Sequence, residues 1–430
     1  MTAVESTSGA DTGRAERSVA TGREFIFLVT ALMAMGAVAI DLMLPTFPDM
    51  REEFGMAPDS AQLGWIITAF FLGLAVGPWL YGPISDRVGR RPPLFFGLGL
   101  YAVSAIAASL APSFAWIVAV RFVWGLGAAA PRSLSLAMIR DRYEGPQMAR
   151  LMSMIMAVFL LVPIVAPGLG AVLNLIAPWR IVFWAPAVVA VALMFWARRV
   201  PETLLPERRR PFTWASVVDA GRVVVTNRQT VSFTIAITFL FGVMMSYLAS
   251  SELIVEDVYG YGAWFPVYFG CIAVLLAASS LNNARLVGRL GINLLVRRMS
   301  VVAVVMAVIL STLAVVTDGL PNFWLFTIVV ALLVPMAQGL VPNCNTAAMM
   351  PVPHVAGTAS AIIGTVSTAG GALLGGMVNG AFDGTVRPFA LGITVFVVIA
   401  AVFVFIGSSG TEAVELQASR APETSRSETG

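Results

Sequence analysis

The sequence predicts an all-α integral membrane protein with twelve transmembrane helices in two pseudo-symmetric six-helix bundles. Of its 430 residues, 58% are hydrophobic and only 12% are charged. A soluble protein carries about 25% charged residues, so this chain has too little polar surface to remain in water. Apolar runs of about 20 residues, the length that crosses a bilayer, recur along the chain, and one long polar interval divides them into two sets.

The first predicted segment is a cytoplasmic tail, 1–23, whose polar and charged composition predicts disorder. No cleavage site follows the first apolar run, which argues against a signal peptide. Twelve spans are then predicted at 24–47, 60–82, 93–111, 114–139, 148–176, 179–199, 230–253, 263–284, 294–316, 321–348, 355–380 and 385–407. They form an N-terminal bundle (24–199) and a C-terminal bundle (230–407), joined by a cytoplasmic linker (200–229) and followed by a tail (408–430).

The distribution of arginine sets the predicted orientation. The chain has no lysine, and 22 of its 27 arginines lie in the tails and connections on the side of the N-terminus. Only three lie in connections on the other side. Because positive residues favour the cytoplasmic side, both termini are predicted to be cytoplasmic. Arginines scattered in this way do not form the basic face that a nucleic-acid partner needs, and the bilayer is the expected surrounding.

The two halves of the sequence repeat one another. The segment 86–89 reads DRVG, and 202 residues later the segment 288–291 reads GRLG. By the same offset, Gly168 matches Gly370. Two repeats with a long cytoplasmic linker are typical of a transporter whose halves rock around a central site.

Three motifs carry a family resemblance. The segment 82–91, GPISDRVGRR, resembles the signature between the second and third helices of the major facilitator superfamily. RFVWGLGAA at 121–129 and APGLG at 166–170, which follows Pro163, resemble the family's second motif and its antiporter motif. Because the three occur in the family's order, the chain is identified as a member of this superfamily.

Further segments are similar to the drug:proton antiporters of the bicyclomycin-resistance branch, and the resemblance covers 24–407. They are AIDLMLP at 39–45, WRIVFW at 179–184, VEDVYG at 255–260, PN at 342–343 and HVAGTAS at 354–360. The resemblance implies proton-driven efflux of small, mainly lipophilic drugs of the chloramphenicol or bicyclomycin type from a bacterial inner membrane. It implies no cofactor, and we expect a monomer. Trp124, Glu252 and Gly288 depart from the branch pattern.

Asp41 is the leading candidate for proton coupling. It lies inside the first predicted span, where a carboxylate costs about 2.5 to 3.5 kcal/mol at a helix centre and is therefore functional by default. The alternative is a structural carboxylate at the outer interface, paired with an arginine. Glu252 is a second candidate, although its nearness to Glu256 and Asp257 also fits a solvated helix end.

Two arginines, Arg121 and Arg132, lie 11 residues apart in the span 114–139 and are expected on one face. Neither can carry the proton, because a guanidinium does not deprotonate in proteins. The resemblance implies that Arg121 faces the cavity and influences proton release. Arg132 is a candidate for binding an anionic substrate group, with a structural ion pair as the alternative.

A conformational latch is expected at the 82–91 segment. Asp86 can accept hydrogen bonds at the start of another helix, and the resemblance implies that this helix is 355–380. The alternative is simple anchoring by the positive charges. The latch residues are Gly82, Asp86, Arg87, Gly89, Arg90 and Arg140.

The span 148–176 is expected to contain a hinge. Pro163 and Pro167 each remove a backbone donor and kink the helix, and Gly168 and Gly170 allow close helix contact. Glycine pairs four residues apart in the spans 60–82 (73 and 77) and 355–380 (371 and 375) predict close packing.

The substrate cavity is expected to be lined by aromatic, methionine and polar side chains, although such residues more often face lipid or packing partners. The candidates are Trp65, Phe70, Trp124, Arg132, Phe241, Met245, Tyr247, Gln338 and Asn345.

Other functions are weighed against efflux. Export of a metabolite such as a sugar, amino acid or siderophore is favoured slightly by Arg132 and Glu252. A receptor or scaffold would not need Asp41 or the repeat. The sequence has no P-loop, so ATP hydrolysis is excluded as the energy source. A membrane enzyme is disfavoured because the sequence has no nucleophile elbow and no His or Cys cluster.

Overall fold

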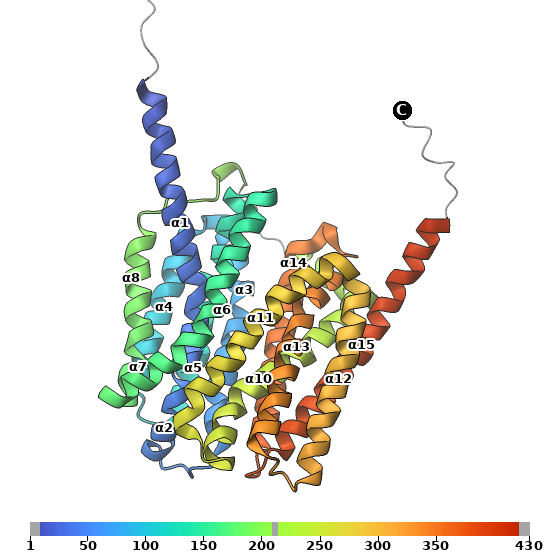
Figure 1. Cartoon of the computed structure of the whole chain (residues 1–430). Coiled ribbons are helices and arrows are strands. Elements are labelled where there is room, and N and C mark those ends of the chain that lie inside the picture. The colour runs from blue at the N-terminus through green and yellow to red at the C-terminus, as the bar shows by residue number, and fades with distance from the viewer. Residues whose placement is uncertain (1–8, 209–213, 421–430) are drawn as a thin grey trace, which may run out of the picture. The chain divides into compact units, whose positions relative to one another are not determined.

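A computed structural model describes residues 9–208 and 214–420, and in this part of the chain it is helical with no strand (Figure 1). Eleven helical segments among the described residues are long and apolar enough to cross a membrane. Helix α6 adds a shorter apolar stretch, Leu161–Ile176. The predicted all-α membrane fold is confirmed.

The described residues divide into two compact units. The first lies within Met1–Gly55 and Leu72–Phe212, and the second within Met56–Phe71 and Thr213–Gly430. The helices up to the linker are α1 (Gly9–Asp41), α2 (Phe47–Glu53), α3 (Gly64–Val88), α4 (Arg91–Ser109), α5 (Phe114–Arg142), α6 (Gly145–Ile176), α7 (Trp179–Val182) and α8 (Trp184–Ala197). Those that follow are α9 (Trp214–Thr226), α10 (Arg228–Leu253), α11 (Phe265–Leu290), α12 (Ile292–Val316), α13 (Phe323–Met349), α14 (Ala356–Gly380) and α15 (Arg387–Arg420).

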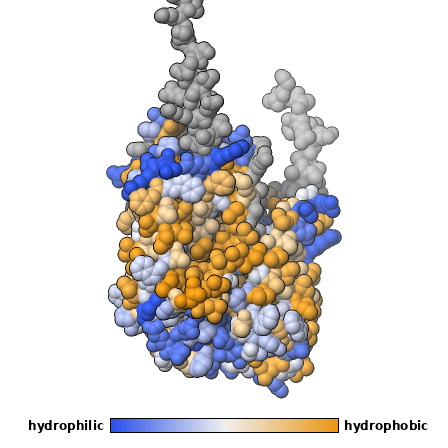
Figure 2. All heavy atoms as spheres, turned by 60° about the vertical axis from the view of Figure 1, so that its left-hand side comes forward, coloured by the Kyte–Doolittle hydropathy of each residue, from blue (hydrophilic) through white to orange (hydrophobic). Residues whose placement is uncertain are grey.

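Polar side chains fix the start of several spans. The Ser113 hydroxyl accepts a hydrogen bond from the Trp116 backbone N–H at 3.3 Å, at the start of α5. Asn227 accepts in the same way from Thr230 at 3.0 Å, at the start of α10. These caps satisfy backbone donors that a helix leaves free at its first turn. On the face that Figure 2 shows, hydrophobic residues form a band between two hydrophilic ends.

Glycines set the closest helix packing within each unit. A Cβ atom at Gly73 of α3 would lie 1.9 Å from the Phe122 carbonyl oxygen of α5. In the second unit, a Cβ at Gly375 of α14 would lie 2.4 Å from the Met245 Cβ of α10. No side chain fits at these distances, so the close packing predicted from the glycine spacing is confirmed.

The structure differs from the prediction at three helix ends and in the linker. α1 begins at Gly9, within the tail predicted to be disordered, and α15 continues to Arg420. Both extensions add residues to a helix that is already nucleated, and elongation costs far less than nucleation. The predicted linker, 200–229, contains a helix that was not predicted, α9. α1 ends at Asp41 rather than at 47, because Pro45 cannot continue the helix.

Candidate functional site

Asp41 is the last residue of α1, at the point where the chain turns towards α2. Only 4% of its surface is exposed. Its carboxylate makes no hydrogen bond or ion pair with a residue that the structure describes. The pairing with an arginine that was the structural alternative is therefore not observed. A buried carboxylate without a fixed partner is costly to keep charged, which marks the position as a candidate for proton exchange.

Arg121 of α5 holds the backbone on both sides of Asp41. Its Nη1 donates to the Ala39 carbonyl oxygen at 3.1 Å, and its Nη2 contacts the Met43 sulfur. The side chain is fully buried. The guanidinium thus fixes the turn that carries the carboxylate through its contacts with Ala39 and Met43.

Aromatic rings enclose this guanidinium. The Arg121 Cζ atom lies 4.8 Å from the centre of the Trp124 ring and 5.7 Å from that of Phe183. The Tyr101 ring packs edge-on against Trp124 at 5.4 Å. The Tyr101 hydroxyl donates to the Met35 carbonyl oxygen of α1 at 3.0 Å. Ring faces attract a cation, most strongly where water is excluded, so the rings stabilise the buried charge.

Helix α6 approaches the same turn through Gly170. A Cβ at Gly170 would lie 2.0 Å from the Leu42 carbonyl oxygen, so only glycine fits. At Gly168 a Cβ would meet nothing within 4 Å, and the close contact predicted for both glycines is found only at Gly170. α6 remains helical through Pro163 and Pro167, which each lack a backbone donor. Candidates predicted from three separate spans therefore meet at the turn that carries Asp41.

The other predicted charged residues lie in different surroundings. Glu252, in the last turn of α10, is 1% exposed, so the alternative of a solvated helix end is wrong. The π-helical turn Ile254–Val258 that follows carries the more exposed Glu256 and Asp257. Arg132 is exposed, whereas Arg121 on the same helix is fully buried. The 11-residue spacing did not give the two arginines a shared environment.

The predicted latch segment forms a network centred on Arg90, which is 8% exposed. Arg90 Nη1 donates to Asp86 Oδ1 at 2.5 Å and to Ser85 Oγ at 2.8 Å. Its Nε donates to Asp141 Oδ2, in the last turn of α5, at 3.0 Å. Burial lowers the pKa of the guanidinium, but the bonds and charges of Asp141 and Asp86 outweigh it and raise the pKa.

Glu202 completes the network from the loop after α8. Its Oε1 accepts from the backbone N–H of Arg90 at 2.9 Å and its Oε2 from that of Arg91 at 3.1 Å, at the start of α4. The N–H groups of Thr203 and Leu204 also donate to Oε1. Burial raises the pKa of Glu202, but these four donors prevail and lower it. The start of α4 is thus capped by a carboxylate.

The network differs from the predicted set of residues. Asp141, Glu202 and Ser85 were missed, and Arg140 and Arg87 are exposed. A Cβ at Gly82 would meet nothing within 4 Å, whereas Gly89 has a φ of +105° that favours glycine. One signal was available: Asp141 and Glu202 are acids placed among the arginines of predicted cytoplasmic connections.

The predicted cavity residues fall into two groups. Phe70, Trp124, Met245 and Tyr247 are buried in protein contacts; the Tyr247 ring, for example, stacks on Phe269 at 5.5 Å. The accessible or partly accessible candidates are Trp65, Arg132, Phe241, Gln338 and Asn345. Among these nine candidates, the second group is the one that exposes surface in this structure. No group of His, Cys, Asp or Glu side chains suited to a metal ion occurs among the described residues.

Comparison with known proteins decides the class. The model of the Major Facilitator Superfamily matches residues 26–375. The chain belongs to this superfamily. It is therefore a multi-pass membrane transporter of small molecules rather than an enzyme, and transporters of this family generally need no cofactor.

Several relatives cover most of the chain. An uncharacterized MFS-type transporter of Bacillus subtilis, YdgK, is 29% identical over 84% of this chain and 89% of its own. The bicyclomycin resistance protein homolog of Haemophilus influenzae is 28% identical over 88% and 96%. Multidrug resistance protein D of Escherichia coli is 26% identical over 81% and 86%.

Solved structures show the same fold. A D-xylose-proton symporter superposes with a TM-score of 0.69 at 15% identity, covering 88% of this chain and 97% of that one. The nucleoside transporter NupG does so with a TM-score of 0.64 at 13% identity, over 90% and 98%. At these identities the likeness concerns the fold alone.

Proposed function

We propose that the protein is a proton-driven exporter of small, mainly lipophilic drugs in a bacterial inner membrane, with both termini in the cytoplasm. The names of the two relatives linked to bicyclomycin and multidrug resistance support the substrate class. The observation that carries the mechanism is the buried Asp41 carboxylate, which has no fixed partner among the described residues.

Asp41 couples proton entry to substrate export because the proton and the substrate compete for its carboxylate. Its carboxylate can hold a proton or interact with a bound substrate, but it cannot favour both at once. A proton that enters from outside neutralises Asp41 and displaces the substrate; release of that proton to the cytoplasm restores the binding state. This cycle turns proton entry into substrate exit.

Arg121 and Gly170 act on the same turn. Arg121 cannot release a proton, so its role is to position the turn through Ala39 and Met43. The close fit of Gly170 against Leu42 links the turn to α6, so that a shift of α6 moves the carboxylate. Alternating access then arises from rocking of the two six-helix halves.

A second candidate function is export of an anionic metabolite. The exposed Arg132 within α5 favours it, because an exposed guanidinium can bind a carboxylate or phosphate of the cargo. Arg132→Gln distinguishes the two: it should abolish export of an anionic metabolite and leave export of neutral drugs close to wild type.

The test uses the full chain in proteoliposomes with an imposed pH gradient and a drug panel that contains chloramphenicol and bicyclomycin. Asp41→Asn should abolish uphill transport and drug-induced proton release into a weak buffer, although binding of neutral drugs should persist. Asp59→Asn, at an exposed carboxylate, is the matched control and should behave as wild type. Undiminished proton release in Asp41→Asn would move the coupling elsewhere, with Glu252 as the next carboxylate to test.

A further inference from the structure

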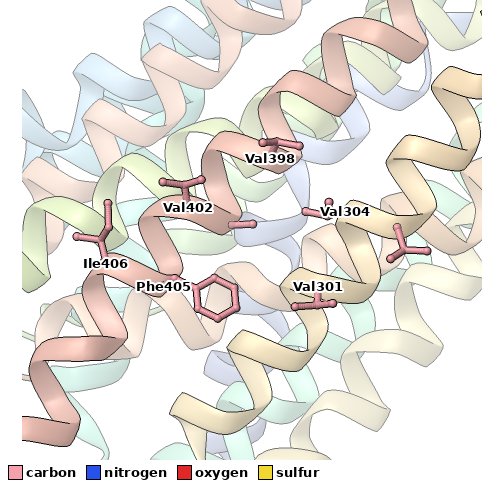
Figure 3. Close-up of a pocket in the computed structure, with 8 residues that line it drawn as sticks. Val301, Val304, Val398, Val402, Phe405 and Ile406 are labelled. Atoms are coloured by element: carbon pink, nitrogen blue, oxygen red, sulfur yellow. The ribbon is translucent and has the colours of Figure 1, made fainter.

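An apolar groove of about 510 Å³ lies between α12 and α15 in the second unit (Figure 3). Its lining side chains are hydrophobic, among them Val301, Val402 and Phe405. Such a groove offers no side chain that could bind a proton or orient a polar group. A segment of the first unit, WRIVF at 179–183, has the polar contacts that the groove lacks, and it contacts both ends of the chain segment that follows Asp41.

Trp179 and Arg180 hold the far end of that segment, at Glu53, the last residue of α2. The Trp179 Nε1–H donates to Glu53 Oε2, and Arg180 donates to Oε1 from Nε at 3.2 Å and also from Nη2. Arg180 Nη1 donates to the Ser109 carbonyl oxygen at 2.7 Å and Nη2 to that of Ala111 at 3.1 Å, at the end of α4. One guanidinium therefore joins the end of α2 to the end of α4, where free carbonyl groups favour a cation.

Val182 and Phe183 hold the near end of the segment. Val182 packs against Leu42, the residue after Asp41, in one buried cluster. The Phe183 ring lies 5.8 Å, centre to centre, from that of Trp124, and these two rings enclose the buried guanidinium of α5. One short stretch of chain thus fixes both ends of the segment.

α2 transmits the position of its end to the turn that carries Asp41. Its Met50 side chain is fully buried, so the helix packs on the unit along one face. Just before α2, the Thr46 hydroxyl donates to the Met43 carbonyl oxygen at 2.7 Å, and Met43 is the residue whose sulfur contacts Arg121. Local opening of such a segment exposes the groups on which it packs, and a fixed end makes that opening rarer.

The ion pair between Arg180 and Glu53 is partly exposed, with side-chain exposures of 32% and 42%. An exposed ion pair contributes little to the free energy of unfolding. Removal of this pair is therefore expected to free the end of α2 without unfolding the unit.

We propose that Arg180 and Glu53 are positioning residues for proton exchange at Asp41. Their contact keeps α2 closed on the Asp41 turn, which restricts exchange of the proton on the carboxylate while no drug is bound. The inference rests on the proposed function, because it requires that Asp41 carries the proton. Without the contact, protons should pass through the protein with no export of drug.

The test measures proton leak in proteoliposomes of the full chain, with an imposed pH gradient and no drug. Glu53→Ala removes both acceptor oxygens and leaves Arg180 bound to the end of α4. Its leak should exceed that of the wild type about fivefold, the effect of losing a contact of about 1 kcal/mol that holds α2 closed. Glu52→Ala, at the neighbouring exposed carboxylate of the same helix, is the matched control and should leak like the wild type. Glu53→Gln keeps one acceptor oxygen, and its leak should lie between those of Glu53→Ala and the wild type.

A double variant separates this inference from the proposed function. When Glu53→Ala is combined with Asp41→Asn, the leak should return to the wild-type level, because the leaking protons pass through Asp41. Thermal unfolding of each variant shows whether it is folded. Should Glu53→Ala fail to fold, Arg180→Lys replaces it, because an ammonium cannot bridge Glu53 and both carbonyl groups of α4.

Two results would overturn the inference. The leak of Glu53→Ala could be no greater than that of Glu52→Ala, whatever its thermal stability. The pair would then be a purely structural contact, and the coupling role of Asp41 would stand on its own test. Alternatively, a raised leak could persist in the double variant, which would show that protons bypass Asp41 and would overturn the proposed coupling as well.

Discussion

Two turns, α3–α4 in the first unit and α11–α12 in the second, share a glycine with positive φ but differ in how their arginines are paired. Gly89 and Gly291, 202 residues apart, follow the ends of α3 and α11 with φ of +105° and +73°. Around Gly89, Arg90 is bonded to two carboxylates. Around Gly291, exposed arginines have no acid nearby in the sequence. The repeat has preserved the path of the chain and not its charges.

This difference indicates different roles for the two turns. The first is fixed by contacts that connect α3, α4, α5 and the loop after α8, as a structural lock requires. The second carries the exposed arginines Arg285, Arg289 and Arg298. Substitutions at matched positions therefore test whether the two turns also differ in their contribution to the free energy of unfolding.

The largest effect is expected at Arg90. Arg90→Ala leaves Asp141, whose side chain is 14% exposed, without its cation, and we expect a loss of about 3 kcal/mol in the free energy of unfolding. Arg289→Ala in the second turn removes an exposed side chain and should cost less than about 0.5 kcal/mol. Chemical unfolding of both variants in the same mild detergent measures the difference.

Similar losses for the two variants would show that the first turn is no more fixed than the second. Arg90→Lys serves as an additional control, because it keeps the charge but cannot bridge Asp86 and Asp141 with one planar group. Its free energy of unfolding should lie between that of Arg90→Ala and that of the wild type.

The sequence predicted the spans, the repeat and the glycine packing, because each depends on residue type at local spacing. Apolar length identifies a span, and a glycine four residues from another predicts a close helix contact. The same local reading identified Asp41, Arg121 and Gly170 one at a time. It could not show that they meet, because Arg121 and Ala39 lie 82 residues apart.

The missed contacts share this cause. Glu202 caps α4 across 112 residues of sequence, and Asp141 reaches Arg90 across 51. Such pairings depend on how the helices pack, which a pattern of residue types does not specify. The end of α1 at Asp41 was missed for another reason: the apolar run continues to 47, and hydropathy outweighed the signal of Pro45.

A second comparison uses the two glycines. Gly291 has a φ of +73° and a ψ of +162°, a conformation that only glycine adopts readily and that costs another residue about 1 to 3 kcal/mol. Gly291→Ala should show this backbone cost alone, because a Cβ there meets nothing within 4 Å. At Gly89 the Cβ would also lie 2.6 Å from Glu202 Oε2, so the cap of α4 must shift. We expect Gly89→Ala to lose about 1 kcal/mol more than Gly291→Ala, the cost of disturbing a hydrogen bond of the cap. Equal losses in thermal or chemical unfolding would mean that the Glu202 cap contributes nothing.

The smallest effect is expected at Glu202 itself, and it depends on pH. Glu202→Gln keeps the oxygen that accepts from Arg90, Thr203 and Leu204 but replaces the one that accepts from Arg91, so about 1 kcal/mol should be lost at neutral pH. The folded state lowers the pKa of Glu202. Its charge therefore stabilises the fold above the unfolded pKa of about 4.3, and this contribution disappears as pH falls through the lower folded value.

The wild type and Glu202→Gln should thus differ in stability at pH 7 and converge as the pH falls below about 4. Glu207→Gln, at an exposed carboxylate in the same loop, should follow the wild type throughout. The second turn has no acid of its own in the sequence, so Gly291→Ala should shift stability equally across this pH range. The difference in the free energy of unfolding between the wild type and Glu202→Gln could instead stay constant with pH. The cap would then act through hydrogen-bond geometry alone, and Arg90 would be the source of the electrostatic difference between the two turns.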